Sequence, residues 1–383
     1  MRFVVTLMVR DEVDIIAAMV EHTLAQGPDM FIVTDNGSID GTTEVLQAYA
    51  DRGLVELHHD PLHNKQQYRL VTQMARCART EYAADWVVNA DADEFWVPVD
   101  KSLTLRDALS AMPRTLNAFD VPVINMVGRP ARRGSGIDRL LWRDLRTNQQ
   151  LNEVGIFAQP TSDAMHRGAP DIEVTQGNHK TSVPTDGSPD PAVALEVLHL
   201  PWRSFAQLEK KVSNTGRAYE ASPNLRPSPN HHGMRDYKRF LAGRLLPSYL
   251  LRQPSAADLA EGSSAGWFVP EPWLRTHLHG LLEDAVLPEQ LAPLLEASGD
   301  EIFDEETVET LSALGRQFHE LEVERDAALE DLRTTRATAA RLAKERDEAR
   351  AALRAHAPAP IDREVRRLAG RVAGGARRRL GRR

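Results

Sequence analysis

The sequence predicts an α/β protein built on a Rossmann-like, mostly parallel sheet with helices on both faces, followed by a C-terminal helical extension. Short apolar runs rich in β-branched residues alternate with segments of helical period along the first hundred of the 383 residues. Polar motifs directly follow three of these runs. Beyond residue 311 the apolar residues adopt a heptad-like spacing in Glu/Arg-rich surroundings.

The elements of the first hundred residues follow one another at short intervals. Residues 3–9 are predicted to form a strand, and Asp11 or Asp14 can cap a helix whose apolar positions run from Ile15 to Leu24. Gly27 and Pro28 end that helix. Further strands are predicted over 30–34, 54–57 and 86–90, and further helices over 42–49 and 66–78. Such alternation is typical of a parallel sheet that is covered on both faces.

Three polar motifs stand at strand ends, namely 10–12, 35–42 and 91–94. In parallel sheets, ligands bind beyond the carboxyl ends of the strands, so all three motifs are expected at one edge. Each loop alone could be solvated surface, and Gly37 and Gly41 could be simple turn residues. Their convergence instead favours a site for a polar, phosphorylated ligand.

The densest of these motifs places Asp91, Asp93 and Glu94 directly after a buried strand. In an extended chain, residues two apart face the same side with their Cα atoms about 7 Å apart. Asp91 and Asp93 can therefore face one hard divalent cation, which prefers oxygen ligands. No Gly-x-Gly-x-x-Gly follows the first strand and the sequence has no Walker-type lysine loop, which disfavours dinucleotide and ordinary ATP-binding loops.

The segments 4–12, 33–42 and 85–95 resemble glycosyltransferase family 2, in the branch whose motif ends Asp-x-Asp-Glu-Phe. The resemblance covers about the first hundred residues well and the next hundred loosely. It implies the GT-A fold, a nucleotide-diphosphate sugar donor and inversion at the anomeric carbon. It also implies that Asp91 lies near the ribose and the metal and that Asp93 ligates the metal. The other nucleotide-binding residues that we predict are Arg10, Asp11, Glu12, Asp35 and Asn36.

Sugar transfer from a nucleotide diphosphate requires that the negative charge growing on the departing diphosphate is stabilised. A bound cation, Mn²⁺ or Mg²⁺, would do this. Asp93 would hold that cation with help from Asp91. Lys65, Arg69 and Arg76 could contact the diphosphate as well. The alternative for each of these three side chains is an ordinary surface charge.

Two histidines are further metal-ligand candidates. His199 directly follows an apolar strand and precedes a helix predicted over 205–212, an arrangement that resembles the family segment in which a histidine returns to the metal. Its alternative is a strand-end histidine bonded to backbone, and His179 is the second candidate. Inversion also needs a base that accepts the acceptor's proton. The base candidates are Asp171, Glu173 and Glu153.

Beyond the first hundred residues we expect strands over 118–127, 153–158 and 193–198, and helices over 236–252 and within 270–315. The predicted domains are a catalytic domain over 1–220, a helical or irregular accessory region over 221–310, a long helix over 311–356 and a basic tail over 357–383.

The long helix carries apolar residues at heptad-like spacing, interrupted at core positions by Arg325, Thr335 and Arg346. This pattern favours a coiled coil that forms a homodimer or docks on a partner, with a lone solvated helix as the alternative. The last 23 residues carry nine arginines and two acids. Such a tail could lie on an anionic membrane or have no fixed partner. Nucleic acid is disfavoured because no aromatic platform accompanies the arginines.

The composition indicates in which compartment the protein is expected. There is no apolar run of about 18 residues, the first residues are typical of a strand rather than a signal peptide, and Cys77 is the single cysteine, so we expect a cytoplasmic protein. Together the observations predict a metal-dependent, inverting glycosyltransferase that acts on a glycan, lipid-linked or other hydroxyl acceptor. A sugar-phosphate nucleotidyltransferase should carry a Gly-rich basic loop after the first strand. A non-catalytic coiled-coil scaffold is the other alternative.

Overall fold

The computed structural model describes residues 1–62, 67–222, 227, 232–296, 299–356 and 365–372. The chain divides into two compact units, Met1–His319 and Glu320–Arg383. Within the described residues, no helix is both long enough and apolar enough to cross a membrane.

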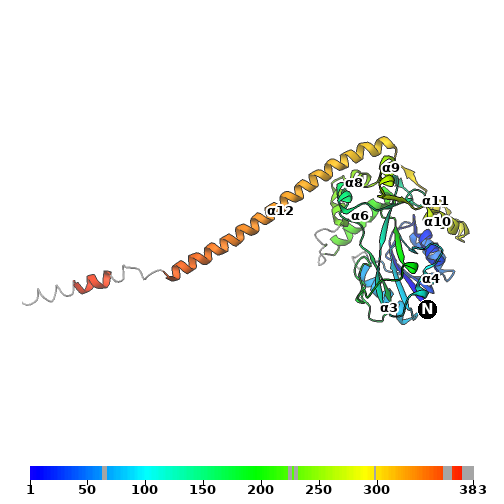
Figure 1. The fold of residues 1–383 in the computed structure, drawn as a ribbon, viewed down its shortest axis with the longest axis horizontal. Coiled ribbons are helices and arrows are strands. Elements are labelled where there is room, and N and C mark those ends of the chain that lie inside the picture. The colour runs from blue at the N-terminus through cyan, green and yellow to red at the C-terminus, as the bar shows by residue number, and fades with distance from the viewer. Residues whose placement is uncertain (63–66, 223–226, 228–231, 297–298, 357–364, 373–383) are drawn as a thin grey trace, which may run out of the picture. The chain divides into compact units, whose positions relative to one another are not determined.

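The first unit is built on a six-stranded sheet with the order β3-β2-β1-β4-β10-β6. Figure 1 draws the chain as a ribbon, with its N-terminal part in blue. The first four strands of this sheet run parallel, and β10 is antiparallel to both of its neighbours. The strands are β1 Phe3–Val9, β2 Met30–Asp35, β3 Glu56–His59, β4 Trp86–Ala90, β6 Ala118–Val121 and β10 Asp163–Arg167. The predicted α/β class with a mostly parallel, Rossmann-like sheet is confirmed.

A second sheet has the order β12-β9-β7-β11-β5. Its strands are β5 Glu94–Pro98, β7 Val123–Val127, β9 Trp142–Asp144, β11 Leu195–His199 and β12 Phe268–Pro270, and β13 Glu301–Ile302 pairs separately with β8 Ala131–Arg133. In this sheet His199 stands opposite Glu94 on one side and Asn125 on the other. The end of β11 is thereby held beside the acidic motif that follows β4.

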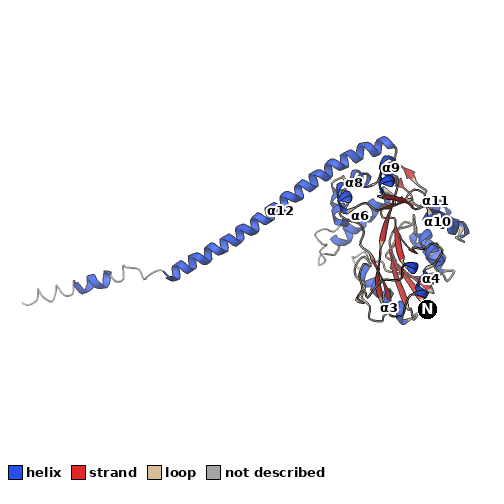
Figure 2. Cartoon of the chain, in the orientation of Figure 1, coloured by secondary structure: helices blue, strands red, loops and turns tan. Residues whose placement is uncertain are grey.

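Helices cover both faces of the first sheet because its strands are apolar on both sides (Figure 2). Val5 and Leu7 share a core with α1, while Val4 shares another with α3. The first four helices are α1 Ile16–Ala25, α2 Thr42–Ala50, α3 Gln67–Thr80 and α4 Leu105–Ala111. These elements agree with the predicted alternation of strand and helix.

The remaining helices of the first unit follow the second sheet or link its strands. They are α5 Asn148–Glu153, α6 Phe205–Glu220, α7 His232–Leu241, α8 Leu245–Arg252, α9 Ala256–Ala265, α10 Trp273–Asp284 and α11 Ala292–Glu296. Short 3₁₀ turns lie at Pro191–Val193 and Glu289–Leu291. The long helix α12, Glu305–His356, begins in the first unit and continues in the second, where residues 365–372 are also helical.

Four local predictions are wrong. No strand forms over 153–158, where α5 ends at Glu153 and residues 154–158 form a turn and a loop. The strand expected over 118–127 is divided at Pro122 into β6 and β7, which belong to different sheets. The helix expected over 236–252 is two helices, separated where Gly243 takes a φ of 67°. Neither Asp11 nor Asp14 caps α1, whose N-cap is Ile15 without a side-chain bond.

Gly216 lies where α6 packs against α7, and a Cβ atom built there would stand 2.3 Å from the ring of Tyr237. Gly→Ala in a helix usually stabilises by about 1 kcal/mol. We expect Gly216→Ala instead to destabilise the protein by about 1–3 kcal/mol because the ring must shift. Chemical unfolding measures the change. Gly280 in α10 is the control, since nothing lies within 4 Å of its Cβ position, and equal stabilisation of both variants would contradict the packing argument.

Candidate functional site

A cleft of about 210 Å³ lies at the carboxyl edge of the first sheet. The loops after β1, β2 and β4 form one side, and α6 forms the other. It is lined by Met8, Val9, Arg10, Asp11, Glu12, Asn36, Gln67, Asp91, Ala92, Asp93, Gln207, Lys210, Lys211, Asn214, Thr215 and Ala218. The structure thus brings the three strand-end motifs to one place, as the parallel sheet requires.

Asp93 is buried at the inner end of the cleft and is surrounded by positive and hydrogen-bonding groups. Its Oδ2 lies 2.8 Å from Lys211 Nζ, 3.4 Å from Arg203 Nη1 and 3.7 Å from His199 Nε2. Burial alone would raise the pKa of Asp93, but Lys211, His199 and Arg203 hold it well below its usual value. Asp93 is therefore a carboxylate.

Arg203 is fully buried and joins carboxylates from the loop after β1. Its Nε donates to Asp14 Oδ2 at 2.9 Å, and its Nη2 donates to Asp14 Oδ1 at 3.1 Å and also to Glu12. Burial raises the pKa of Glu12 to about 7 in spite of the nearby Arg203 charge. One guanidinium thus holds three acidic side chains of the site together, because it also contacts Asp93.

Asp91 lines the outer part of the cleft. Its Oδ1 accepts hydrogen bonds from Gln67 Nε2 at 3.1 Å and from Asn178 Nδ2 at 3.2 Å. Its backbone N–H donates to Glu94 Oε2 at 3.2 Å. Burial raises the pKa of Glu94 well above its usual value, and the negative charge of Asp91 is the second largest cause of this rise. Glu94 supports the turn through this hydrogen bond, while the carboxyl group of Asp91 faces the cleft.

His199 is oriented by Asn125. The His199 Nδ1–H donates to Asn125 Oδ1 at 2.9 Å, so Nε2, the atom nearest Asp93, is the nitrogen that offers a lone pair when the ring is neutral. Asp91, Asp93 and His199 offer donor types that suit Mn²⁺ or Mg²⁺. Among the described residues no three His, Cys, Asp or Glu side chains are already arranged around a common metal position. Lys211 Nζ lies against Asp93, so a cation would have to displace it.

His179 does not line the cleft. Its Nδ1 lies 3.0 Å from Asp163 Oδ1, and this hydrogen bond raises its pKa. The preceding residue, Asn178, has a φ of 60° and turns its side chain to Asp91 instead. The structure therefore places Asn178 in the site, where the sequence analysis singled out His179.

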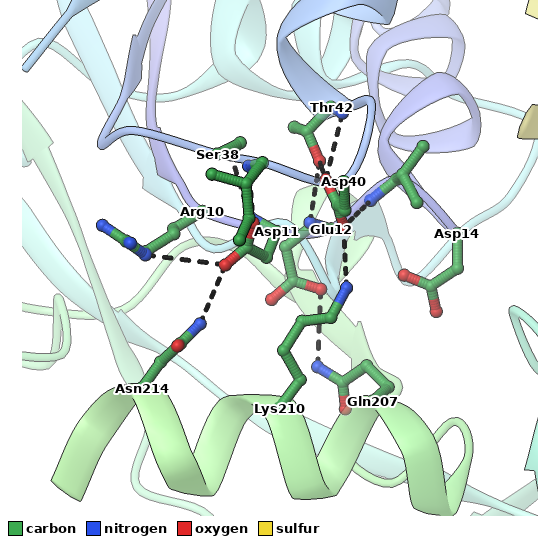
Figure 3. A network of polar contacts seen from close by, with 12 residues as sticks. Arg10, Asp11, Glu12, Asp14, Ser38, Asp40, Thr42, Gln207, Lys210 and Asn214 are labelled. Carbon is green, nitrogen blue, oxygen red and sulfur yellow. Dashed lines mark hydrogen bonds and ion pairs between the residues drawn. The ribbon is translucent and has the colours of Figure 1, made fainter. Parts of the chain in front are cut away.

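The loop after β1 is fixed by side-chain bonds on both flanks (Figure 3). Asp11 has a φ of 57°, and its Oδ1 accepts from Ile39 N at 2.9 Å. Its Oδ2 accepts from Asn214 Nδ2 at 3.0 Å and lies 3.5 Å from Arg10 Nε. Arg10 Nη1 donates to the Asn36 carbonyl at 2.6 Å. These contacts hold Arg10, Asp11 and Asn36 at the cleft.

Asp35 shapes the neighbouring loop without lining the cleft. Its Oδ1 accepts from Ser38 N at 3.1 Å and from Ser38 Oγ at 2.6 Å, and its Oδ2 accepts from Thr43 Oγ1 at 2.6 Å. Both oxygens are thus used within the loop. Asn36 does line the cleft, and its Nδ2 donates to the Asp60 and Leu62 carbonyls at 2.9 Å each.

The three base candidates are not brought to the cleft. Glu153, Asp171 and Glu173 are all exposed, and none lines it. Arg76 Nε donates to the Ile172 carbonyl at 2.7 Å and so ties that segment to α3, away from the cleft. Arg69 Nη2 binds Asp60 at 3.2 Å and also does not line the cleft. Lys65 lies outside the described residues.

The sequence analysis missed the contribution of α6. Gln207, Lys210, Lys211 and Asn214 all line the cleft from this helix. Their spacing of i, i+3, i+4 and i+7 places them on one helical face. Lys210 Nζ binds Asp40 Oδ2 at 2.9 Å, and Gln207 Nε2 lies 3.4 Å from Glu12 Oε2 (Figure 3). A polar stripe at helical spacing was the available signal.

Comparison with known proteins gives one family match. The model of glycosyltransferase family 92 matches residues 4–125, which include β1 to β6 and all three strand-end motifs. The protein is therefore a glycosyltransferase-class enzyme. The matching family is family 92, so the resemblance to family 2 and its Asp-x-Asp branch stays a prediction. Among curated proteins, none matches the chain significantly.

Solved glycosyltransferases show only a distant likeness. S. aureus TarS 1–349 in complex with UDP has 14% sequence identity and a TM-score of 0.30, with 85% of this chain and 92% of that chain covered. The galactosyltransferase LgtC in complex with donor and acceptor sugar analogs has 11% identity and a TM-score of 0.26, with 76% and 100% covered. Similarity this low carries no argument about the site.

Proposed function

We propose that this enzyme transfers a sugar from a nucleotide-diphosphate sugar to a hydroxyl acceptor, with inversion and with a bound Mn²⁺ or Mg²⁺. The supporting observation is the cleft in which three strand-end loops meet the basic face of α6. A nucleotide diphosphate needs both kinds of group, namely hydrogen-bonding side chains for the nucleoside and positive charge for the phosphates.

The residues of the cleft, together with His199 beside Asp93, fall into groups with different chemical roles. Arg10, Asp11, Glu12 and Asn36 offer charged and amide groups to the base and ribose on one side. Asp91, Asp93 and His199 would hold the cation, which neutralises negative charge on the departing diphosphate when it is bound. Lys211 stands beside Asp93 and can donate to phosphate oxygens. The hydrogen bond to Asn125 keeps His199 Nε2 directed at Asp93.

The acceptor that we propose is a glycan or lipid-linked hydroxyl, at a cytoplasmic membrane face. The single cysteine suits a reducing compartment. Residues 365–372 are helical and expose Val365, Leu368 and Val372 beside Arg366, Arg367 and Arg371. Exposed apolar residues beside arginines fit peripheral contact with an anionic bilayer.

Thermal unfolding with a panel of nucleotide diphosphates, with and without Mn²⁺, tests the proposal. A ligand at 100 times its Kd stabilises the native state by about 2.7 kcal/mol. We expect one nucleotide to raise the Tm only with metal, and Asp93→Asn to abolish that rise. Asp120→Asn, an exposed position on β6, is the matched control and should keep it. Wild-type protein that responds to no nucleotide with either metal would contradict the proposal.

A further inference from the structure

The second unit exposes one long helical surface in the described residues. From Glu320 to Ala355 nearly every side chain of α12 is exposed, including Leu321 at 58%, Leu342 at 54% and Leu353 at 73%. Earlier in the same helix, Val308 and Leu311 pack against a buried cluster, and the Gly315 Cβ position lies 2.3 Å from the Pro247 carbonyl oxygen. The exposed surface with apolar residues therefore begins at Leu321.

This surface follows a seven-residue repeat. We name it the α12 seam, and it consists of Leu321, Arg325, Ala328, Leu332, Thr335, Ala339, Leu342, Arg346, Ala349 and Leu353. The steps alternate between four and three residues without a break. A strict heptad repeat drifts around a straight helix and faces one side continuously only in a left-handed supercoil. The seam is therefore suited to a second helix rather than to a flat surface.

We propose that the α12 seam pairs with the same seam of a second copy of this chain, as a parallel, in-register, two-stranded coiled coil. The two arginines carry the argument. Arg325 and Arg346 occupy a positions, and a glutamate stands directly before each of them at g, namely Glu324 and Glu345. In a parallel pair, an a side chain lies beside the partner's g residue, so each arginine meets a glutamate of the other helix.

Within one chain these arginines have only weak local contacts. Arg325 Nε lies 2.9 Å from Asp326 Oδ1, and Arg346 Nε lies 2.9 Å from Asp347 Oδ1. All four side chains are more than half exposed, and exposed pairs of this kind contribute little to stability. Little free energy is therefore lost when the two arginines leave these aspartates and pair with glutamates of the second helix.

The flanking charges select the parallel orientation. A g residue of one helix meets the e residue five positions later on its parallel partner, which pairs Asp331 with Arg336 and Glu345 with Arg350. In an antiparallel pair, g faces g. In the antiparallel register that sets Leu321 beside Leu353, Asp331 would face Glu345, which is unfavourable. Two-fold symmetry closes the parallel pair as a dimer, and this conclusion does not depend on the transfer reaction.

Disulfide trapping in the full-length protein tests the orientation. In a Cys77→Ser background, Leu321→Cys and Leu342→Cys should each give covalent dimers on mild oxidation, because identical d positions adjoin only in register. Lys344→Cys, at the outer f position, is the control and should remain uncrosslinked. A crosslink that forms only when Leu321→Cys and Leu353→Cys chains are mixed would show antiparallel pairing and overturn the proposal.

Light scattering across a dilution series tests the charge argument. We expect a dimer whose Kd rises at least about tenfold in Glu324→Arg/Glu345→Arg, because arginines then face arginines across the seam. Glu330→Arg/Glu348→Arg makes the same charge change at outer positions and should leave the Kd within about twofold. A wild-type chain that stays monomeric throughout the series, or equal weakening by both double variants, would overturn the proposal.

Discussion

Arg203→Met is expected to lower the free energy of unfolding by about 3–5 kcal/mol, because it leaves buried carboxylates without their partner. Arg203 has no exposed surface and holds Asp14 by two hydrogen bonds of 2.9 and 3.1 Å, as well as Glu12 and Asp93. Methionine keeps most of the apolar stem but none of the donors. Denaturant unfolding at neutral pH measures the loss through the midpoint at unchanged m-value.

Two further variants show whether the loss comes from the buried charge. Lys210→Met removes a lysine of the same cleft whose side chain is 42% exposed and paired with Asp40, and it should cost no more than about 1 kcal/mol. Arg203→Lys restores the charge without the planar fork and should recover only part of the stability. Unpaired buried carboxylates have raised pKa values, so the Arg203→Met deficit should shrink toward acid pH. A deficit independent of pH would contradict this explanation.

The strand-end acids could be found from sequence because they depend only on local pattern and on the topology of parallel sheets. A buried strand followed by Asp91 and Asp93 is visible in the printed sequence, and parallel strands must end at one edge. For these two aspartates, knowledge of the neighbouring strand was sufficient. His199 was chosen from its place after an apolar strand and from the family resemblance, and the pairing of that strand with β5 holds it beside the acidic motif.

The rest of the site depends on contacts between distant segments. Arg203 and Asp14 are 189 positions apart, and arginines are seldom fully buried, so no local signal predicts their contact. The polar stripe of α6 is visible in the sequence, but its contacts with the loop after β1 depend on how the helix packs. Glu153, Asp171 and Glu173 were chosen by residue type in a region without strong periodicity, and folding leaves them exposed away from the cleft. Asp35 was placed at the correct edge, but its bonds to the loop depend on the turn geometry.

Lys211→Met is expected to reduce turnover by about 10²–10³, the usual effect of removing one donor to developing charge. Lys211 Nζ lies 2.8 Å from Asp93 Oδ2, at the inner end of the cleft, where we place the diphosphate. Burial would lower the pKa of Lys211, but Asp93 and Glu12 raise it above its usual value, so the group stays charged. It can therefore balance Asp93 in the empty cleft and bind phosphate oxygens in the loaded one.

The contact between Lys211 and Asp93 also predicts that Lys211→Met has an opposite effect on metal binding. Because the Lys211 ammonium competes with a divalent cation for Asp93, its removal should tighten Mn²⁺ binding to the free protein. Loss of one modest charge contact of about 1.4 kcal/mol corresponds to a Kd that is lower by about tenfold. Mn²⁺ titration followed by electron paramagnetic resonance measures this without turnover. Lys210→Met, one position away on α6 and bound to Asp40, is the matched control and should leave the Kd for Mn²⁺ unchanged. Weaker Mn²⁺ binding in Lys211→Met would instead mean that Lys211 positions Asp93 for the metal, because a competing cation cannot strengthen the affinity that it opposes.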